Sequence, residues 1–228
     1  SEMCIRDRYI PTPEHAEMMI YPRVLALAEV AWSAPSKKNY EDFHVRALKA
    51  VEELKKSGYN PFELKNEIGN RPGADKPVEH LAVGKKVTYG LDAAYYPGYA
   101  AGGDTALVDG VRGGWTYGDK RWQGFIDKKR MDITIDLEKE TELHFIGADF
   151  MQVCGPEVFM PAEVIISISD DGKDFTELKH IEHKVVKDDK VTFTNFGWEG
   201  NAKGRYVRYQ ATSGKFGGFL FTDEVVIK

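Results

Sequence analysis

The chain has 228 residues, of which 42% are hydrophobic and 29% charged, and its formal net charge is -5. This composition is typical of an ordered globular protein with one large domain, or one domain and an appendage. It excludes a disordered chain and a globally basic nucleic-acid-binding protein, and no apolar run reaches the roughly 18 to 20 residues that span a bilayer. The first eight residues, SEMCIRDR, resemble a sequencing adapter or a fusion scar and are excluded from the fold prediction.

A first helix is predicted from Pro13 to about Trp32. Thr12 is a favoured N-cap residue, Pro13 a favoured first-turn residue, and Glu14 an acid that complements the helix dipole. We expect a kink at Pro22, because a proline inside a helix removes a hydrogen bond and crowds the preceding turn.

The second half of this helix, residues 21–32, is apolar on almost every side. Such a helix is normally buried on all faces, so it is expected to lie against a large structure. Only about twenty residues stand before it. The helix is therefore interpreted as the last piece of a bigger structure.

A second helix is predicted from about Tyr40 to Ser57, closed by Gly58. Apolar residues recur along it at intervals of four, four and three, namely Phe43, Ala47, Val51 and Leu54. The following stretch, about residues 60–77, is rich in Pro, Gly and Asn, which indicates a linker.

Beyond the linker, the pattern changes to short alternating runs that are typical of strands. Four runs carry it, namely residues 131–137, 164–169, 205–210 and 219–222. The Asp170-Asp171-Gly172-Lys173 segment indicates a hairpin turn. We therefore predict a mainly β protein, with an antiparallel sandwich or jelly roll over residues 78–228.

The N-terminal part, EHAEMMIYPRVLALAEVAWSAPSKKNYEDF, resembles the last helical segment of family 20 glycoside hydrolases, the β-N-acetylhexosaminidases. The run Tyr-Pro-Arg-x-x-Ala-Leu-Ala-Glu-x-x-Trp-Ser carries this resemblance, which covers about residues 9–70. It implies that the two helices are the end of a (β/α)8 barrel.

The remainder resembles a discoidin domain, also called a factor 5/8 type C domain, which is related to family 32 carbohydrate-binding modules. Five marks occur in order: Ala106-Leu107-Val108-Asp109-Gly110, Trp122 before Ile133-Thr134-Ile135-Asp136-Leu137, Ser169 to Phe175, Gly204 to Arg208, and Thr222 to Val225. The resemblance implies a discoidin-like jelly-roll β-sandwich.

Both resemblances together identify the chain as similar to the C-terminal part of a secreted bacterial hexosaminidase. The expected organisation is a non-native leader at 1–8, barrel helices at 9–59, a linker at 60–77 and the sandwich at 78–228. The resemblance implies a periplasmic, cell-surface or secreted parent that removes terminal N-acetylhexosamines from glycans, with the missing catalytic barrel as the partner of this chain.

The family 20 resemblance implies catalysis by a mid-barrel Asp-Glu pair with the substrate's acetamido group as nucleophile. No position here matches the context of that pair. Asp223 and Glu224 are adjacent, but they end the chain in a strand pattern. The chain itself is therefore expected not to be catalytic.

The discoidin resemblance also implies a structural calcium ion, Ca2+, held by loop carbonyls, a loop aspartate and a glutamate near the C-terminus. Asp109 and Glu224 fall on the matching positions. Calcium accepts six to eight oxygens in an irregular cage. The alternative is that Asp109 only begins a turn with Gly110 and Glu224 is a solvated strand residue.

A sugar site would need exposed aromatic rings that stack on a pyranose. The loops offer four candidates for ligand binding, Trp115 and Tyr117 first, then Tyr96 and Tyr99. Trp122 is expected in the core. The resemblance implies a glycan of the GlcNAc, GalNAc or galactose type, and the alternative is a purely structural sandwich that braces the barrel without binding sugar.

Overall fold

The computed structural model describes residues 10, 12–65, 71, 73–74, 76–90, 94–126, 131–188 and 191–228. The chain divides into two compact units, Ser1–Asp75 and Lys76–Lys228. The predicted leader, residues 1–8, lies outside the described residues, as does part of the predicted linker.

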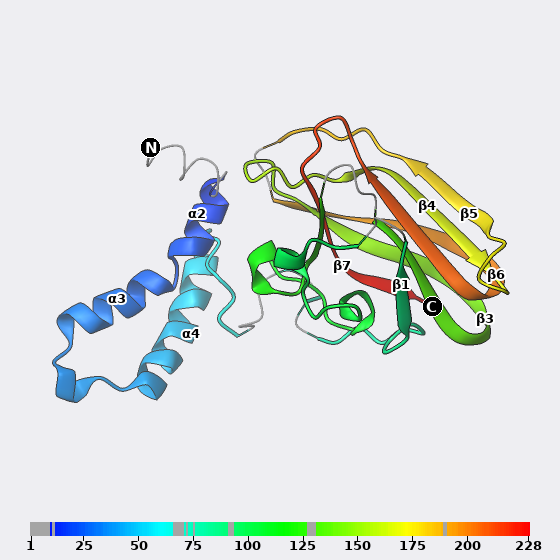
Figure 1. Ribbon diagram of the computed structural model, residues 1–228. Coiled ribbons are helices and arrows are strands. Elements are labelled where there is room, and N and C mark those ends of the chain that lie inside the picture. The colour runs from blue at the N-terminus through cyan, green and yellow to red at the C-terminus, as the bar shows by residue number, and fades with distance from the viewer. Residues whose placement is uncertain are drawn as a thin grey trace. The chain divides into compact units, whose positions relative to one another are not determined.

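The first unit is helical and consists of α2 (Pro13–Ile20), α3 (Arg23–Trp32), the short 3-10 helix η1 (Pro35–Lys37) and α4 (Tyr40–Lys56) (Figure 1). The Thr12 hydroxyl accepts a hydrogen bond from the His15 amide at 3.1 Å, which confirms the predicted N-cap. The predicted single helix with a kink at Pro22 is instead two helices, separated at Tyr21 and Pro22. Proline has no amide hydrogen to donate to the helical hydrogen bonds, so the helix is interrupted there. None of the helices among the described residues has both the length and the apolar character of a membrane-spanning helix.

The helical unit covers little of its own apolar surface. Helix α4 buries Ala47 and Val51, whereas α3 buries no residue at all, and Trp32 is 91% exposed. A groove of about 350 Å³ lies between α3 and α4 and is lined mainly by apolar side chains. Glu29 and Arg46 join the two helices by a bidentate ion pair with oxygen–nitrogen distances of 3.0 and 3.1 Å. The apolar face of α3 is therefore left to solvent.

The second unit is built from antiparallel strands, which confirms the predicted mainly β fold class. The strands are β1 (Lys86–Tyr89), β2 (Gln123–Ile126), β3 (Met131–Gln152), β4 (Pro161–Ser169), β5 (Thr176–Glu182), β6 (Thr192–Ser213) and β7 (Phe219–Ile227). The strand order is β2-β7-β3-β6-β4-β5, and β1 pairs with β3. Short 3-10 helices interrupt the loops at η2 (Pro97–Tyr99), η3 (Ala106–Val108) and η4 (Tyr117–Asp119).

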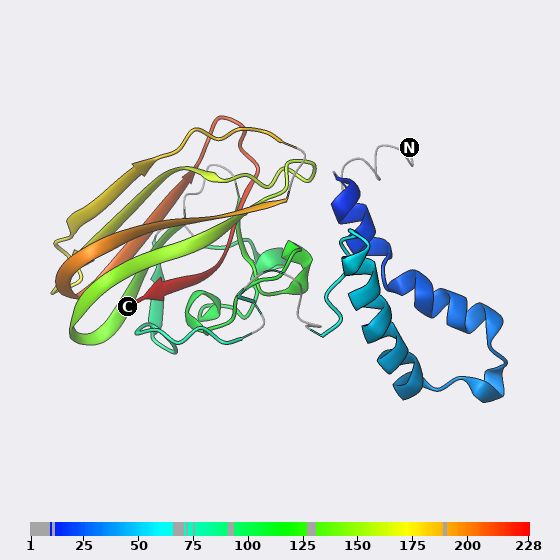
Figure 2. The same cartoon turned by 180° about the vertical axis from the view of Figure 1, so that it is seen from behind.

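The two long strands β3 and β6 make the sheet into a sandwich. Residues 131–136 of β3 pair with residues 206–211 of β6, and residues 133–136 also pair with β1. Residues 145–152 pair with residues 192–199 and, in part, with β7. Two register shifts between residues 136 and 145 separate these halves. Because bulges bend strands, the sheet turns there and its halves face each other (Figures 1 and 2).

The main core lies between the two halves and includes Ile135 from one and Phe150 from the other. Side chains alternate along a strand, so Met151 and Phe221 point to the opposite face from their neighbours Phe150 and Leu220. There they join a second cluster, which we call the outer cluster: Trp122, Met151, Val153, Val158 and Phe221. The loops between β1 and β2 therefore have an apolar base to pack on.

A short stretch before β1, residues 78–84, forms hydrogen bonds with two other parts of the sandwich, and we call it the entry segment. The Val78 amide donates to the Gly110 carbonyl, and the Gly84 amide to the Val108 carbonyl, both at 2.8 Å. The Leu81 amide donates to the Ile227 carbonyl of β7, also at 2.8 Å. The entry segment thus joins the loop after η3 to the last strand.

Candidate functional site

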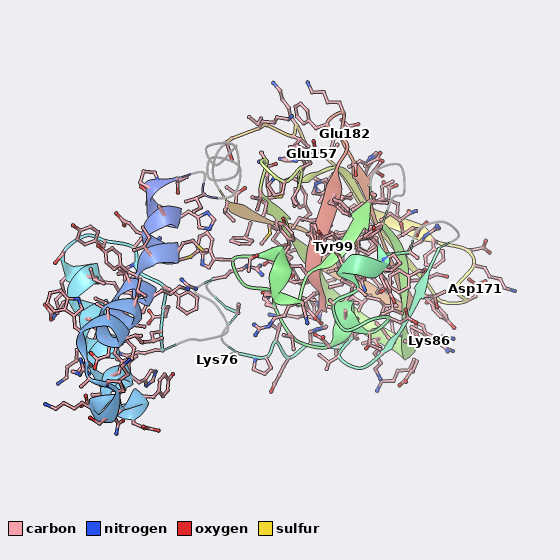
Figure 3. The ribbon with its side chains drawn as sticks, turned by 60° about the vertical axis from the view of Figure 1, so that its left-hand side comes forward. Lys76, Lys86, Tyr99, Glu157, Asp171 and Glu182 are labelled. Carbon is pink, nitrogen blue, oxygen red and sulfur yellow. The ribbon has the colours of Figure 1, made fainter. Side chains whose placement is uncertain are left out.

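The four aromatic residues predicted to contact sugar lie on the loops around η2 and η4, and we call them the aromatic loop cluster: Tyr96, Tyr99, Trp115 and Tyr117. Three of them pack together over the end of β7, where Tyr99 and Tyr117 each lie 4.9 Å from the Phe221 ring centroid. Figure 3 shows Tyr99 beside this strand. The structure therefore gathers these rings on one base.

The members of the cluster differ in their exposure. Tyr96 is 44% exposed and meets the Phe219 ring edge-on, with centroids 5.8 Å apart. Trp115, the first candidate from the sequence, is instead half-buried, and its ring packs edge-to-face on Phe193 at 5.3 Å. Its indole Nε1 is buried without an acceptor among the described residues. Tyr96 therefore presents the most accessible ring.

The loop that carries Trp115 is held by specific hydrogen bonds. The Gly113 amide donates to Asp223 Oδ2 at 3.0 Å, and Trp122 Nε1 donates to the Gly114 carbonyl at 3.2 Å. A Cβ atom at Gly113 would lie only 2.1 Å from Trp122 Nε1, so a side chain cannot fit there. As expected, Trp122 belongs to the core, with 1% of its surface exposed.

Below this loop, two acids of β7 are buried. The side chains of Asp223 and Glu224 have no exposed surface, so Glu224 is not the solvated strand residue of the alternative interpretation. Glu224 Oε1 accepts hydrogen bonds from His80 Nε2 at 2.7 Å and from the Gly110 amide at 3.1 Å. Its other oxygen, Oε2, is buried without a hydrogen-bond partner among the described residues.

The structure brings Asp109 to this buried glutamate. Burial, the charges of Asp109 and Asp223, and a side-chain hydrogen bond with Asp109 raise the pKa of Glu224 to about 9, so without a cation its carboxyl group is protonated at neutral pH. Asp109 itself is exposed, and its Oδ1 accepts a hydrogen bond from the Val111 amide at 2.8 Å, as in the predicted turn. The two carboxyl groups therefore lie close enough to share a proton, one of them buried and the other accessible.

These residues fit a hard cation such as calcium. Ca2+ would supply the positive charge that the Asp109 and Glu224 carboxylates lack, and it accepts carboxylate and carbonyl oxygens together. In the part of the chain that the structure describes, no group of three or more His, Cys, Asp or Glu side chains is arranged to hold a metal ion. A calcium ion here would therefore take its remaining ligands from carbonyl or water oxygens.

His80, on the entry segment, completes the surroundings of Glu224. Burial, reinforced by the charges of Arg112 and Lys228, lowers the pKa of His80 to about 4, so the imidazole is neutral at physiological pH. Its Nδ1 is within reach of the Ala82 amide, at 3.3 Å, and of the Ile227 amide, at 3.5 Å. Both are donors, so Nδ1 is the acceptor and Nε2 carries the proton.

Arg112 connects the loop to two strands. Its Nη1 forms an ion pair with Asp149 of β3 and lies 3.9 Å from Asp223 Oδ1. The amide of Asn195 on β6 donates to the other oxygen of Asp149 at 2.7 Å. These contacts fix the segment between Asp109 and Trp115 against the sheet.

The sequence did not single out two residues of this site, His80 and Arg112. His80 is separated from Glu224 by 144 positions, so no local spacing connects them. The apolar base of the aromatic loop cluster was missed for the same reason, because Phe193, Phe219 and Phe221 come from late strands.

The sequence and the structure were compared with those of known proteins. Residues 92–225 match the model of the F5/8 type C domain family. Comparison with the curated proteins gives no match.

Among solved structures, the chain is similar to CpGH89CBM32-5 from Clostridium perfringens in complex with GalNAc-β-1,3-galactose, with 17% identity and a TM-score of 0.44 over 62% of this chain and 93% of that chain. It is similar to a Streptococcus pneumoniae fucose-binding module, with 18% identity and a TM-score of 0.46. The match covers 66% of this chain and 98% of that chain. It is also similar to a GH29 fucosidase from Ruminococcus gnavus in complex with fucose, with 13% identity and a TM-score of 0.47, over 65% of this chain and 26% of that chain.

Proposed function

The chain belongs to the F5/8 type C domain family, and from this premise we propose that residues 76–228 form a carbohydrate-binding module. The observation that carries the proposal is the aromatic loop cluster, in which one exposed ring, Tyr96, is backed by further rings. An exposed ring of this kind stacks on the apolar face of a pyranose, and neighbouring polar groups orient its hydroxyls.

Within this proposal, Tyr96 takes the place of Trp115 as the main sugar contact. Tyr96 is 44% exposed, whereas the rings of Trp115 and Tyr117 are half-buried against Phe193 and Phe221. The Tyr99 ring packs beside the Tyr96 ring in a tilted arrangement, with the two ring centroids 6.0 Å apart. The ligand that we propose is a terminal sugar of the GlcNAc, GalNAc or galactose type.

A second candidate function has an observation of its own. Trp115 and Tyr117 are engaged in packing on Phe193 and Phe221, which is what a purely structural sandwich requires. In that case the sandwich braces a catalytic domain and binds no sugar.

We also propose that Asp109 and Glu224 bind a structural calcium ion. Two observations support this proposal: the buried Glu224 Oε2 accepts no hydrogen bond from a donor among the described residues, and the accessible Asp109 carboxylate interacts with Glu224. The ion would neutralise both carboxylates and fasten the loop at Gly110 to β7. Because a ligand that binds only the folded state stabilises it by mass action, calcium at 100 times its Kd would add about 2.7 kcal/mol.

The helical unit supports a proposal about the parent protein. Its α3 buries no residue and exposes Leu27 and Trp32 at 68% and 91%. We propose that this face packs on the catalytic barrel of a family 20 β-N-acetylhexosaminidase. The parent would then act in the periplasm, on the cell surface or outside the cell, with catalysis residing outside this chain.

The test is a glycan array probed with the full chain in calcium, including terminal GlcNAc, GalNAc and galactose. We expect a reproducible signal that Tyr96→Ala abolishes and Tyr96→Phe retains, because phenylalanine keeps the ring and loses only the hydroxyl. A blank array from folded protein would favour the structural brace. A signal that survives Tyr96→Ala would place the site elsewhere.

A further inference from the structure

We propose that His80 is the positioning residue of the cation site, and that it holds Oε1 of Glu224 so that Oε2 remains available to bind the cation together with Asp109. This inference rests on the proposed calcium site. It assigns a role to a residue of the entry segment, outside residues 92–225 that match the family.

The hydrogen bonds of His80 determine how it acts. The side chains of His80 and Glu224 both have no exposed surface, and Nε2 lies 2.7 Å from Oε1. Since Nδ1 faces the amides of Ala82 and Ile227, the proton is on Nε2 and is donated to Glu224. Both ring nitrogens are therefore occupied, and His80 has no nitrogen left for an ion.

The consequence for Glu224 is an asymmetric carboxylate. Oε1 receives two donors, the His80 imidazole and the Gly110 amide, whereas Oε2 receives none among the described residues. With Oε1 held from two sides, the carboxyl group cannot turn, and Oε2 keeps its orientation. Side chains that hydrogen-bond to a metal ligand orient it in this way, and their loss typically lowers metal affinity by about 10- to 100-fold.

The entry segment fixes the imidazole in turn. Residues on either side of His80 are bound to the sandwich, through the Val78 amide to the Gly110 carbonyl and through the Leu81 amide to the Ile227 carbonyl. The loop that supplies Asp109 and the strand that supplies Glu224 are therefore joined by the segment that also carries His80. A module that began at residue 92 would lack this positioning group.

Two substitutions separate positioning from simple packing. In His80→Asn, the side-chain oxygen can still accept from the Ala82 amide in an Asx turn, but the side chain is too short to reach Glu224. In His80→Gln, the longer amide can still donate to Glu224 Oε1, but the turn acceptor is lost. The control is Val83→Ala, at a side chain of the entry segment that is 43% exposed.

The experiment is calorimetric titration of chelator-treated full chain with calcium chloride, with thermal unfolding measured on the same samples. Wild type and Val83→Ala should bind equally. We expect His80→Asn to bind about 10- to 100-fold more weakly, and His80→Gln to keep most of the affinity.

The possible failures are distinct. If wild type does not bind calcium, the cation site fails and this role with it. If wild type binds and His80→Asn binds equally well, only the positioning role is overturned. Equal losses in both variants would also overturn it, since packing alone would then explain them.

Nitrogen NMR of wild-type imidazoles provides a test that needs no variant to fold. The proposal requires the tautomer of His80 protonated at Nε2, both in chelator and in calcium. The tautomer protonated at Nδ1 would contradict it.

Discussion

The two units of the chain place the same kind of residue in opposite surroundings. Trp122 in the sandwich is 1% exposed and lies in the outer cluster, whereas Trp32 at the end of α3 is 91% exposed. The sandwich buries Trp122 among its own residues. The helical unit does not bury Trp32, and its helix α3 buries no residue. The sandwich therefore has an aromatic core of its own, which the helical unit lacks.

The largest expected effect contrasts these two tryptophans. Trp122→Ala should lower the free energy of unfolding of the sandwich by about 3–5 kcal/mol, because it leaves a cavity beside Phe193. Trp32→Ala should change stability by no more than about 0.5 kcal/mol. Denaturant unfolding of the full chain measures both. Equal effects would remove the distinction between the units.

A smaller effect is expected in the loop that carries the aromatic cluster. Gly113→Ala forces a methyl group into the Trp122 ring and should cost about 1–3 kcal/mol. Gly118→Ala on the same loop is the control, because its nearest neighbour is the Thr116 hydroxyl at 3.4 Å. Thermal unfolding compares them. If Gly113→Ala melts like Gly118→Ala, the loop is not held as described.

The smallest effect is a pH-dependent one at the β4–β5 turn, on the edge labelled Asp171 in Figure 3. Hydrogen bonds from the Asp174 and Lys173 amides and the Ser169 hydroxyl lower the pKa of Asp171 to about 2. Its ionised form therefore stabilises the folded state above its ordinary pKa of 3.8, and this contribution is lost as the pH falls towards 2.

Asp171→Asn should accordingly melt below wild type at pH 5 to 7, with the gap closing between pH 4 and 2. The exposed neighbour Asp170→Asn is the control and should follow wild type. A gap that stays constant down to pH 2 would contradict the account.

Much of the fold follows from local patterns. The Thr12 cap, the second helix and the alternating runs predict the helices and most of the strands, because each signal lies within a few residues. The 22-residue length of β3 does not follow, since Glu138 to Thr141 resembles a turn. In the structure the register shifts between Asp136 and Thr141, and pairing with β6 resumes at Thr141.

The candidate site was predictable only in part. The positions of Asp109 and Glu224 came from a family resemblance, and the structure brings them together. The burial of Trp115 depends on Phe193, and the bonds of Glu224 depend on His80. Contacts between segments that are distant in the sequence form only when the sheet folds into a sandwich, so residue spacing along the chain does not predict them.

The comparison of the two units is tested most directly by hydrogen exchange of the full chain, followed by mass spectrometry. The account predicts that amides of β3, β6 and β7 exchange only through global unfolding, whereas amides of α2, α3 and α4 exchange far faster through local opening. Equal protection of the helices and the central strands would contradict the central claim that the sandwich is self-sufficient and the helical unit is not.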